Sequence, residues 1–387
     1  MLPFGCSSLM IANAFLMHFG CLKDPRQTTK ISYRLFDVLF LTICAVIAGA
    51  EGWEDIEDFG KVHLEWLQKK GLFPDGIPVH DTIARIISRL DPTQFRQCFI
   101  HWVKSVNKLT EGALVAIDGK VLRRAYDRKN RCSPIHMVSA FATHNGVVMG
   151  PLKTDAKSNE ITAIPVLLKL LELKGCLISI DAMGCQTSIA DTIVKQGGDY
   201  LLAVKGNQKQ LQSMVKKALR PLCAARGTDS KNMVVEKGHG RIEVREYYVI
   251  PAGDLTAQFP EWKKLKTLGA AVSYRLDKSG KESLEYRYYI SSAELDGARF
   301  ASAVRDHWRI ENSLHWVLDV SMNEDACPIR RAEAGEILSC MRHIALNMLR
   351  AEKTKKASIR RKQKIASMDS AYLEQILTAG FDFMDKK

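Results

Sequence analysis

The chain has 387 residues, of which 46% are hydrophobic and 26% charged, and this balance excludes a wholly disordered protein. At about 100–200 residues per domain, the length predicts two or three domains and excludes a small module held together by disulfides. Lysine and arginine outnumber aspartate and glutamate by 56 to 43, and the net charge of +13 favours nucleic acid, an anionic membrane surface or a phosphorylated substrate as partner, with a basic enzyme lacking any polyanionic partner as the alternative.

The ten cysteines indicate a reducing compartment, because none forms a Cys-x2-Cys pair or a Cys/His spacing suited to zinc. No lysine or arginine precedes Lys23, so the basic region of a signal peptide is missing from the apolar start of the chain. The apolar run over residues 38–50 is shorter than the about 20 residues that a membrane-spanning helix needs. We therefore expect a cytoplasmic protein without a membrane span.

Residues 1–110 have the apolar spacing of helices. Residues 35–47 carry a broad apolar face, and Trp53, Ile56 and Phe59 continue at helical spacing. The run from Pro74 to Pro78 predicts a turn between helices. This part is predicted to be an N-terminal helical domain.

Residues 111–230 alternate between apolar runs typical of strands and helical patterns. Strands are expected over residues 113–118, 135–142, 147–152, 176–181 and 200–204. Asn145-Gly146 between two of these runs predicts a hairpin, and helices are expected after Asn159, over 186–196 and from about 208. Three strands followed by alternating helices and strands are the order of the ribonuclease-H-like fold. We therefore predict an α/β protein with a mixed sheet and helices on both faces.

The rest of the chain divides by pattern into three parts. Residues 231–295 are rich in strands and predict a β-rich insertion that interrupts the catalytic core. Residues 296–350 are helical and are expected to complete that core. Residues 351–387 are predicted to be a basic tail that contacts phosphate or is a disordered end, since lysines and arginines crowd residues 350–364.

Two aspartates share a position in the pattern. Asp118 and Asp181 each end a short apolar strand, and groups at the carboxyl ends of strands line the crevice of open α/β sheets. If the two strands are neighbours, the carboxylates repel one another, and a divalent cation relieves that repulsion. The alternative is that each acid caps the turn after its strand. The shared context and the strand order favour the cation site.

A third acid is expected on the helix that follows the insertion. Trp308, Glu311 and His315 fall on one helical stripe, which suggests a polar site facing inward. An amphipathic helix with Glu311 in a surface ion pair is the alternative. Other acids lie close by and spacing does not decide among them: Asp306, Asp319, Glu324 and Asp325.

A series of short strings, taken together in their order and spacing, resembles the H-repeat-associated transposases, which are insertion-sequence enzymes of the DDE superfamily. The resemblance covers almost the whole chain. Its strings are DPR (24–26), AEGWEDI (50–56), PVHDT (78–82), IDGK (117–120), KSNEI (157–161), DAMGCQ (181–186), AVKGNQ (203–208), HGRIE (239–243) and HWRIEN (307–312).

The resemblance implies a catalytic triad that also holds the metal: Asp118 as first acid, Asp181 as second and Glu311 as third. The gap of 130 residues between Asp181 and Glu311 fits the β insertion of such enzymes. One departure matters. Related transposases carry a Tyr-x2-Arg-x3-Glu-x6-Lys signature, where this chain has Val304, His307 and Leu318. Processing of the strands through a DNA hairpin is therefore not carried over.

The resemblance further implies Mg²⁺, with Mn²⁺ as a substitute, and two cations held by the triad. The expected reaction is cleavage at the element ends and transfer of the freed 3′-hydroxyl to target DNA. The expected partners are double-stranded DNA and further copies of the chain bound to it, and the expected location is the bacterial cytoplasm, at the nucleoid when DNA is bound. Two alternatives stay open: an inactive or repurposed protein that binds DNA without cutting, and a metal-dependent nuclease without strand transfer.

Basic residues near the acids are candidates for holding phosphate, although each can equally be a solvated surface charge. They are Lys120, Lys205, His239, Arg241 and Arg309. Trp308 is expected to be a core residue rather than a group that stacks on a base.

Overall fold

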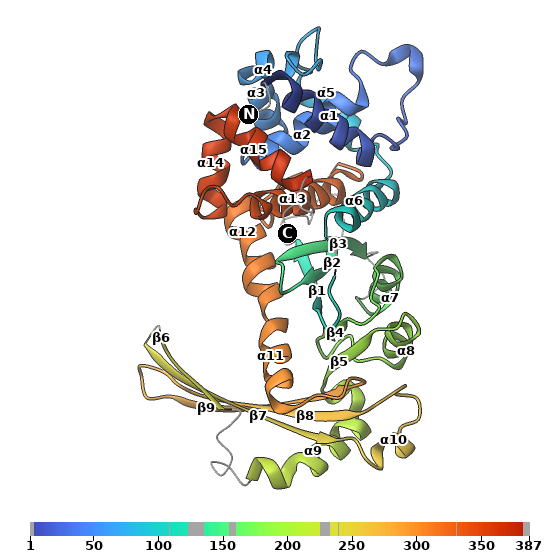
Figure 1. The fold of residues 1–387 in the computed structure, drawn as a ribbon, viewed down its shortest axis with the longest axis vertical. Helices are drawn as coiled ribbons and strands as arrows, with labels where there is room; N and C mark the ends of the chain where they lie inside the picture. The colour runs from blue at the N-terminus through green and yellow to red at the C-terminus, as the bar shows by residue number, and fades with distance from the viewer. Residues whose placement is uncertain are drawn as a thin grey trace.

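In the computed structural model, the residues described are 4–107, 109–122, 135–154, 160–224, 233–238, 240–329 and 331–381. Strands in these ranges form one mixed sheet of nine strands in the order β3-β2-β1-β4-β5-β9-β8-β7-β6 (Figure 1). Their bounds are β1 (Leu114–Leu122), β2 (Ile135–Ala142), β3 (Val147–Thr154), β4 (Leu177–Ile180), β5 (Asp199–Val204), β6 (Met233–Gly238), β7 (Arg241–Pro251), β8 (Thr267–Leu276) and β9 (Glu282–Ser291).

The first five strands have the ribonuclease-H-like order that the sequence predicts. β1, β2 and β3 are antiparallel, while β4 and β5 run parallel to β1. Gly146, in the left-handed region at φ 68°, lies in the turn between β2 and β3, where Asn-Gly predicted a hairpin. The ladder between β1 and β4 ends at the pair Ile117 and Ile180. The residues that follow this pair, Asp118 and Asp181, therefore lie at adjacent points of the sheet edge.

The β-rich insertion extends the same sheet. β9 pairs with β5, and β8, β7 and β6 follow it in antiparallel order, so that β6 to β9 form one ribbon. Figure 1 shows this ribbon as the long, bent sheet at one end of the molecule, with α11 rising from it toward the core sheet. The insertion thus lies directly beside the core strands β1 to β5.

Helices cover both faces of the sheet, as predicted. One face packs on α7 (Glu160–Leu170), α8 (Thr187–Lys195) and α9 (Lys209–Ala224) in a single apolar core. The other face packs on α11 (Gly297–His307), the π-helical turn η5 (Ile310–His315), α12 (Trp316–Met322) and α13 (Ala334–Ala351). The short helix α10 (Leu255–Gln258) and the 3₁₀ turn η3 (Gly206–Gln208) lie in connections.

The N-terminal helices share one core with the C-terminal helices (Figure 1). The N-terminal set is α1 (Phe4–Phe19), η1 (Thr28–Lys30), α2 (Leu35–Ile47), α3 (Trp53–Val62), α4 (Leu64–Gln68), α5 (His80–Ile87) and α6 (Pro92–Val106). α13 lies between α2 and β3 and so joins this helical layer to the sheet. None of the helices described is long and apolar enough to cross a membrane.

The predicted basic tail is wrong for residues 351–381. They form α14 (Ile359–Met368) and α15 (Ser370–Phe381), and Leu373, Ile376 and Leu377 are fully buried in the shared core. The basic side chains near residue 360 hid this helical spacing, because they lie on the outer face of a short amphipathic helix. Lys362 is an exception, since it is buried and paired with Glu352.

Candidate active site

Asp118 lies where β1 leaves the buried centre of the sheet. The preceding residues, Leu114 to Ile117, are buried, and the aspartate side chain is 17% exposed. Side chains alternate between the two faces of a strand, so Asp118 shares the face of Ala116, on which α11 to α13 pack. This geometry points a carboxylate toward the helix that carries Glu311.

Asp181 follows β4 and holds the loop behind that strand. Its Oδ1 accepts hydrogen bonds from the backbone N–H groups of Met183, at 3.0 Å, and Gly184, at 3.3 Å. The turn cap that was the alternative interpretation is therefore present. Oδ2 accepts no hydrogen bond from the described residues, so the cap leaves one carboxylate oxygen for another partner.

The string AVKGNQ (203–208) also fixes the loop that carries Asp181. The side-chain amide of Asn207 donates to the carbonyl of Ala182 at 2.7 Å, and that of Gln208 donates to the carbonyl of Cys185 at 3.0 Å. The end of β5 thus holds the loop that carries Asp181. Sequence reasoning missed this role, although the amides beside a glycine at a strand end were a signal for it.

Glu311 and His315 come from the π-helical turn η5, between α11 and α12. His315 Nδ1 lies 3.4 Å from Glu311 Oε2 and 3.6 Å from Asp118 Oδ2. The possible ligand atoms of these three side chains all lie within 4.8 Å of one another. Asp181 is not in this tight group, but its charge reaches Asp118. A π-helical turn often marks a functional site, because its extra residue redirects side chains.

The electrostatics of the site show closely packed like charges. Burial first, and then the Glu311 carboxylate, raise the pKa of Asp118 to about 8. The hydrogen bond with His315 holds the pKa of Glu311 down, at about 2. His315 is 5% exposed, and its fully buried Nε2 has no hydrogen-bond partner among the described residues.

Asp319 and Glu324, two of the acids considered as alternatives to Glu311, pair with Lys120. The Lys120 ammonium pairs with Asp319 and lies 2.8 Å from Glu324 Oε2, and its side chain is only 9% exposed. Ser339 donates a hydrogen bond to the other oxygen of Glu324, which is buried. In this structure Lys120 therefore contacts two carboxylates: it shares the face of Asp118 and joins β1 to α12, and its contact with DNA stays a prediction. Its partners lie about 200 residues away, so spacing could not reveal them.

The other predicted basic residues that the structure describes lie at the surface. Lys205 is exposed and, with Asp181, lines a small cavity of about 110 Å³. Arg309 is exposed and lies 3.7 Å from Asp306. Arg241 lines a larger groove on the β insertion. His239 lies outside the described residues.

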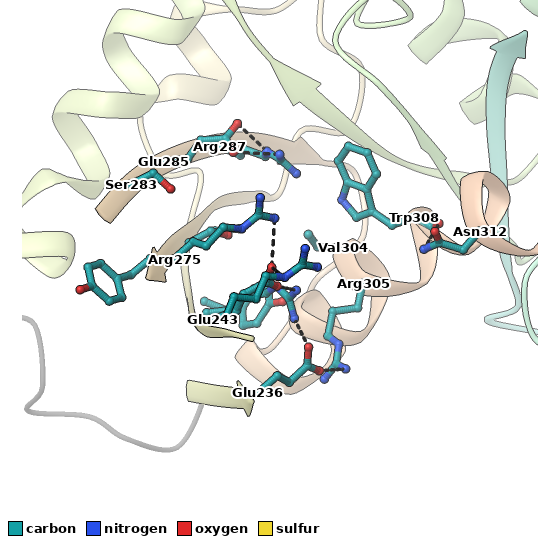
Figure 2. Close-up of a pocket in the computed structure, with 16 residues that line it drawn as sticks. Glu236, Glu243, Arg275, Ser283, Glu285, Arg287, Val304, Arg305, Trp308 and Asn312 are labelled. Carbon is teal, nitrogen blue, oxygen red and sulfur yellow. Dashed lines mark hydrogen bonds and ion pairs between the residues drawn. The ribbon is translucent and has the colours of Figure 1, made fainter. Parts of the chain in front are cut away.

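This groove, here called the arginine groove, lies between the β7–β9 ribbon and α11, and has a volume of about 600 Å³ (Figure 2). Five arginines and three glutamates line it, which leaves a surplus of positive charge: Arg241, Arg245, Arg275, Arg287 and Arg305 against Glu236, Glu243 and Glu285. The small cavity beside Asp181 shares Arg287, Val304 and Trp308 with it. The groove therefore leads toward the carboxylates.

Trp308 is not a core residue, contrary to the expectation. It is 43% exposed, and the guanidinium carbon of Arg287 lies 4.6 Å from its ring centre. Figure 2 shows the ring beside Arg287 at the mouth of the groove. The helical stripe was therefore wrong for Trp308: the π-helical turn η5 brings Glu311 and His315 to Asp118, while Trp308, before that turn, lines the groove that the insertion forms.

Comparison with known proteins gives consistent matches. The family model described as "Transposase DDE domain" matches residues 110–348, and the model described as "DDE_Tnp_1-associated" matches residues 16–103. The chain is 50% identical over 365 residues to the "H repeat-associated putative transposase YhhI" of Escherichia coli (strain K12), covering 93% of this chain and 96% of that protein. It is 48% identical to the "Putative transposase YncI" of Escherichia coli O157:H7, covering 96% of both chains. Among solved structures, a piggyBac transposase synaptic complex with hairpin DNA covers 95% of this chain and is itself covered to 80%, with 12% identity and a TM-score of 0.42.

Proposed function

This chain belongs to the family of transposases with a DDE domain, and from that premise we propose that it cuts DNA at insertion-element ends and joins the freed 3′-hydroxyls to target DNA. The observation that supports this most is that the possible ligand atoms of Asp118 and Glu311 lie within 4.8 Å of one another. Asp181 and the arginine groove lie nearby. The proposed catalytic and metal-holding residues are Asp118, Asp181 and Glu311, and His315 joins them from the same turn as Glu311.

The side chains fit a divalent cation. Carboxylate oxygens are the donors that Mg²⁺ prefers, and Mn²⁺ accepts imidazole nitrogen as well. Burial, and then repulsion from Glu311, raise the pKa of Asp118, and a bound cation would offset both by compensating the charge of the carboxylates. We propose Mg²⁺ as the cofactor, with Mn²⁺ as a substitute. The cation would supply the Lewis acid that in-line displacement at phosphorus requires.

The protein's own residues would position the reactants. The loop contacts hold Asp181, and the π-helical turn positions the backbone of Glu311, which would favour a preorganised site. Lys205 and Arg287 line the cavity next to Asp181 and would neutralise the phosphate that is attacked. Water would be the nucleophile in the cleavage step, and a DNA 3′-hydroxyl in the joining step.

Double-stranded DNA is the proposed partner. The arginine groove offers five guanidinium groups, several of them held by glutamates in fixed positions, as between Arg275 and Glu243 at 3.0 Å. Guanidinium groups bind phosphate oxygens in pairs, and such contacts position DNA without reading its sequence. Arg241 belongs to this surface, and we propose that Lys205 and Arg309 extend it.

The first prediction tests cleavage. Duplex DNA carrying the element's own ends is incubated with the chain in Mg²⁺, and nicked products are separated on denaturing gels. Asp118→Asn, Asp181→Asn and Glu311→Gln should each reduce cleavage by at least about a hundredfold, since each removes a charged oxygen donor. DNA binding should stay within a few fold, because basic residues make the phosphate contacts.

The matched control is Asp306→Asn, which removes an acid from the helix just before Glu311 and away from the carboxylate group. It should cleave as the unaltered chain does. Equal loss of cleavage in Asp306→Asn and Glu311→Gln would contradict the assignment of Glu311. Cleavage in EDTA equal to that in Mg²⁺ would contradict the cofactor.

A further inference from the structure

Glu160 approaches β1 at the residue next to Asp118. It is the first residue of α7, and its carboxyl group lies where a Cβ of residue 119 would be: an added Cβ would come within 2.1 Å of the Glu160 Cδ and Oε1. The φ of Gly119 is not in the left-handed region, so the glycine provides space rather than an unusual backbone. The Glu160 carboxylate thus occupies the space that a side chain at position 119 would fill.

The sheet is open at this point. β4 stops at Ile180, opposite Ile117, so β1 has no β4 neighbour from residue 118 onward. α7 packs on β2 and β3 and brings Glu160 to β1 at this opening. A carboxylate that rests on Gly119 therefore reaches the strand end from the side opposite to α11, which carries the chain toward Glu311.

No lysine or arginine among the described residues pairs with Glu160. Burial, and then the charge of Asp181, raise the pKa of Glu160. No hydrogen bond or ion pair joins its carboxylate to a described residue, and the positive groups that act on it are His136 and His315 at longer range. The charges of Asp181 and His315 thus reach Glu160, which lies at the residue next to Asp118. The Nε2 of the buried His315 has no partner among the described residues.

We propose that Glu160 is a fourth carboxylate ligand of the metal centre and that, with Asp181, it holds a second divalent cation at the end of β4. Asp118, Glu311 and His315 would hold the other cation. The proposal rests on the proposed function, because it assumes a metal centre at these acids. It explains why a half-buried glutamate lies beside another acid, and why residue 119 has no side chain.

The second prediction is a count of bound metal. Mn²⁺ is titrated into the full chain, and free Mn²⁺ is measured by electron paramagnetic resonance. The unaltered chain should bind about two Mn²⁺ at saturation. Glu160→Gln keeps the shape of the side chain but removes its charge, and should bind about one. The control Glu172→Gln, just beyond the same helix and with a side chain 80% exposed, should bind as the unaltered chain does.

Two further measurements separate a ligand from a structural residue. In EDTA, Glu160→Gln should raise the melting temperature, because it removes repulsion from Asp181, whereas altering a residue that supports the fold would lower it. Gly119→Ala should displace the carboxylate and also bind one Mn²⁺ fewer. Full Mn²⁺ binding by Glu160→Gln, with reduced binding by Asp118→Asn, would overturn the inference and leave the proposed function standing. A chain that binds no Mn²⁺ at all would overturn both.

Discussion

Asp118 keeps a proton at a pH at which an exposed aspartate is ionised, because it is buried and faces Glu311. Such a group is a poor contributor to stability. Its carboxylate is kept close to other acids although the folded chain gains nothing from that contact without a cation. Groups at functional sites are often held in arrangements that lower the stability of the fold but are needed for the reaction.

The third prediction follows from this pKa. The pKa of Asp118 is about 8 in the folded chain against an ordinary value of 3.8, so the folded state binds more protons in this range than the unfolded state. Stability contributed by this group therefore falls as the pH rises from 4 toward 8. Asp118→Asn cannot ionise, and should raise the melting temperature in EDTA at pH 8 but leave it nearly unchanged at pH 4.

The measurement is the melting temperature of both chains in EDTA across this pH range. The pKa of Glu311 is lowered to about 2, so the stability linked to it is lost as the pH falls below its ordinary value of 4.5, whereas the loss linked to Asp118 develops as the pH rises toward 8. A difference between the chains that is the same at both pH values would contradict the charge repulsion described for Asp118.

Single residues also show where sequence reasoning ends. Asp118 and Asp181 were predictable, because a strand that ends in an acid is a local pattern. Glu160 lies in the KSNEI string but has the pattern of a helix start, and only the contact with Gly119 shows its position. Lys120 looks like a DNA contact in the sequence because its partners, Asp319 and Glu324, are brought to it by tertiary packing that no local spacing encodes.

At the scale of elements, the β7–β9 ribbon presents two different faces. Tyr247, Ala271 and Tyr289 face α11 on the groove side, while Ala270, Val272 and Ile290 pack on the side of α9. That residues 231–295 are rich in strands was predictable from alternating patterns. That these strands extend the core sheet through the pairing of β9 with β5 was not predicted. The groove was not predictable either, because it depends on how far α11 lies from the bent ribbon, and this distance is set by the packing of Phe300 and Val304.

The fourth prediction concerns this groove. Arg275→Ala removes a half-exposed guanidinium from it and should weaken binding of duplex DNA. The slope of log affinity against log salt should become shallower by about 0.9 for each phosphate that the variant no longer neutralises. Arg220→Ala removes the same charge from α9, on the opposite side of the ribbon, and serves as the matched control.

Affinity is measured by fluorescence anisotropy at several salt concentrations. Arg220→Ala should leave the slope unchanged. If both variants change the slope equally, overall charge rather than the groove attracts DNA, and the proposed path of DNA along the ribbon would be contradicted.

At the scale of the whole molecule, three layers lie along the chain's longest axis: the shared helical layer, the core sheet and the ribbon (Figure 1). The helical layer contains both the start and the end of the described chain. At its C-terminal end, Glu352 follows α13 and contacts Lys362 of α14 and Tyr372 of α15. The sequence predicted the layers as separate segments. It could not predict that α14 and α15 return to the N-terminal helices, since that contact spans most of the chain.

The proposed joining step requires more DNA-binding surface than cleavage alone. A nuclease needs only the carboxylates and one DNA strand. Joining also requires a free 3′-hydroxyl to be held in line with a second phosphodiester, and good positioning of two reactants can contribute about 7–11 kcal/mol to lowering the barrier. The ribbon and the helical layer, on either side of the core sheet, provide surface for a second DNA segment.

The fifth prediction, and the most direct test of the account, is a joining assay with pre-cut element ends and an unrelated duplex in Mg²⁺. Ends with a free 3′-hydroxyl should be joined by the unaltered chain and not by Asp118→Asn, and ends finished with a 3′-dideoxy nucleotide should bind equally well and fail to join, because the nucleophile is missing. If free-hydroxyl ends are never joined while uncut ends are cleaved efficiently, the chain is a nuclease and the proposed strand transfer is contradicted.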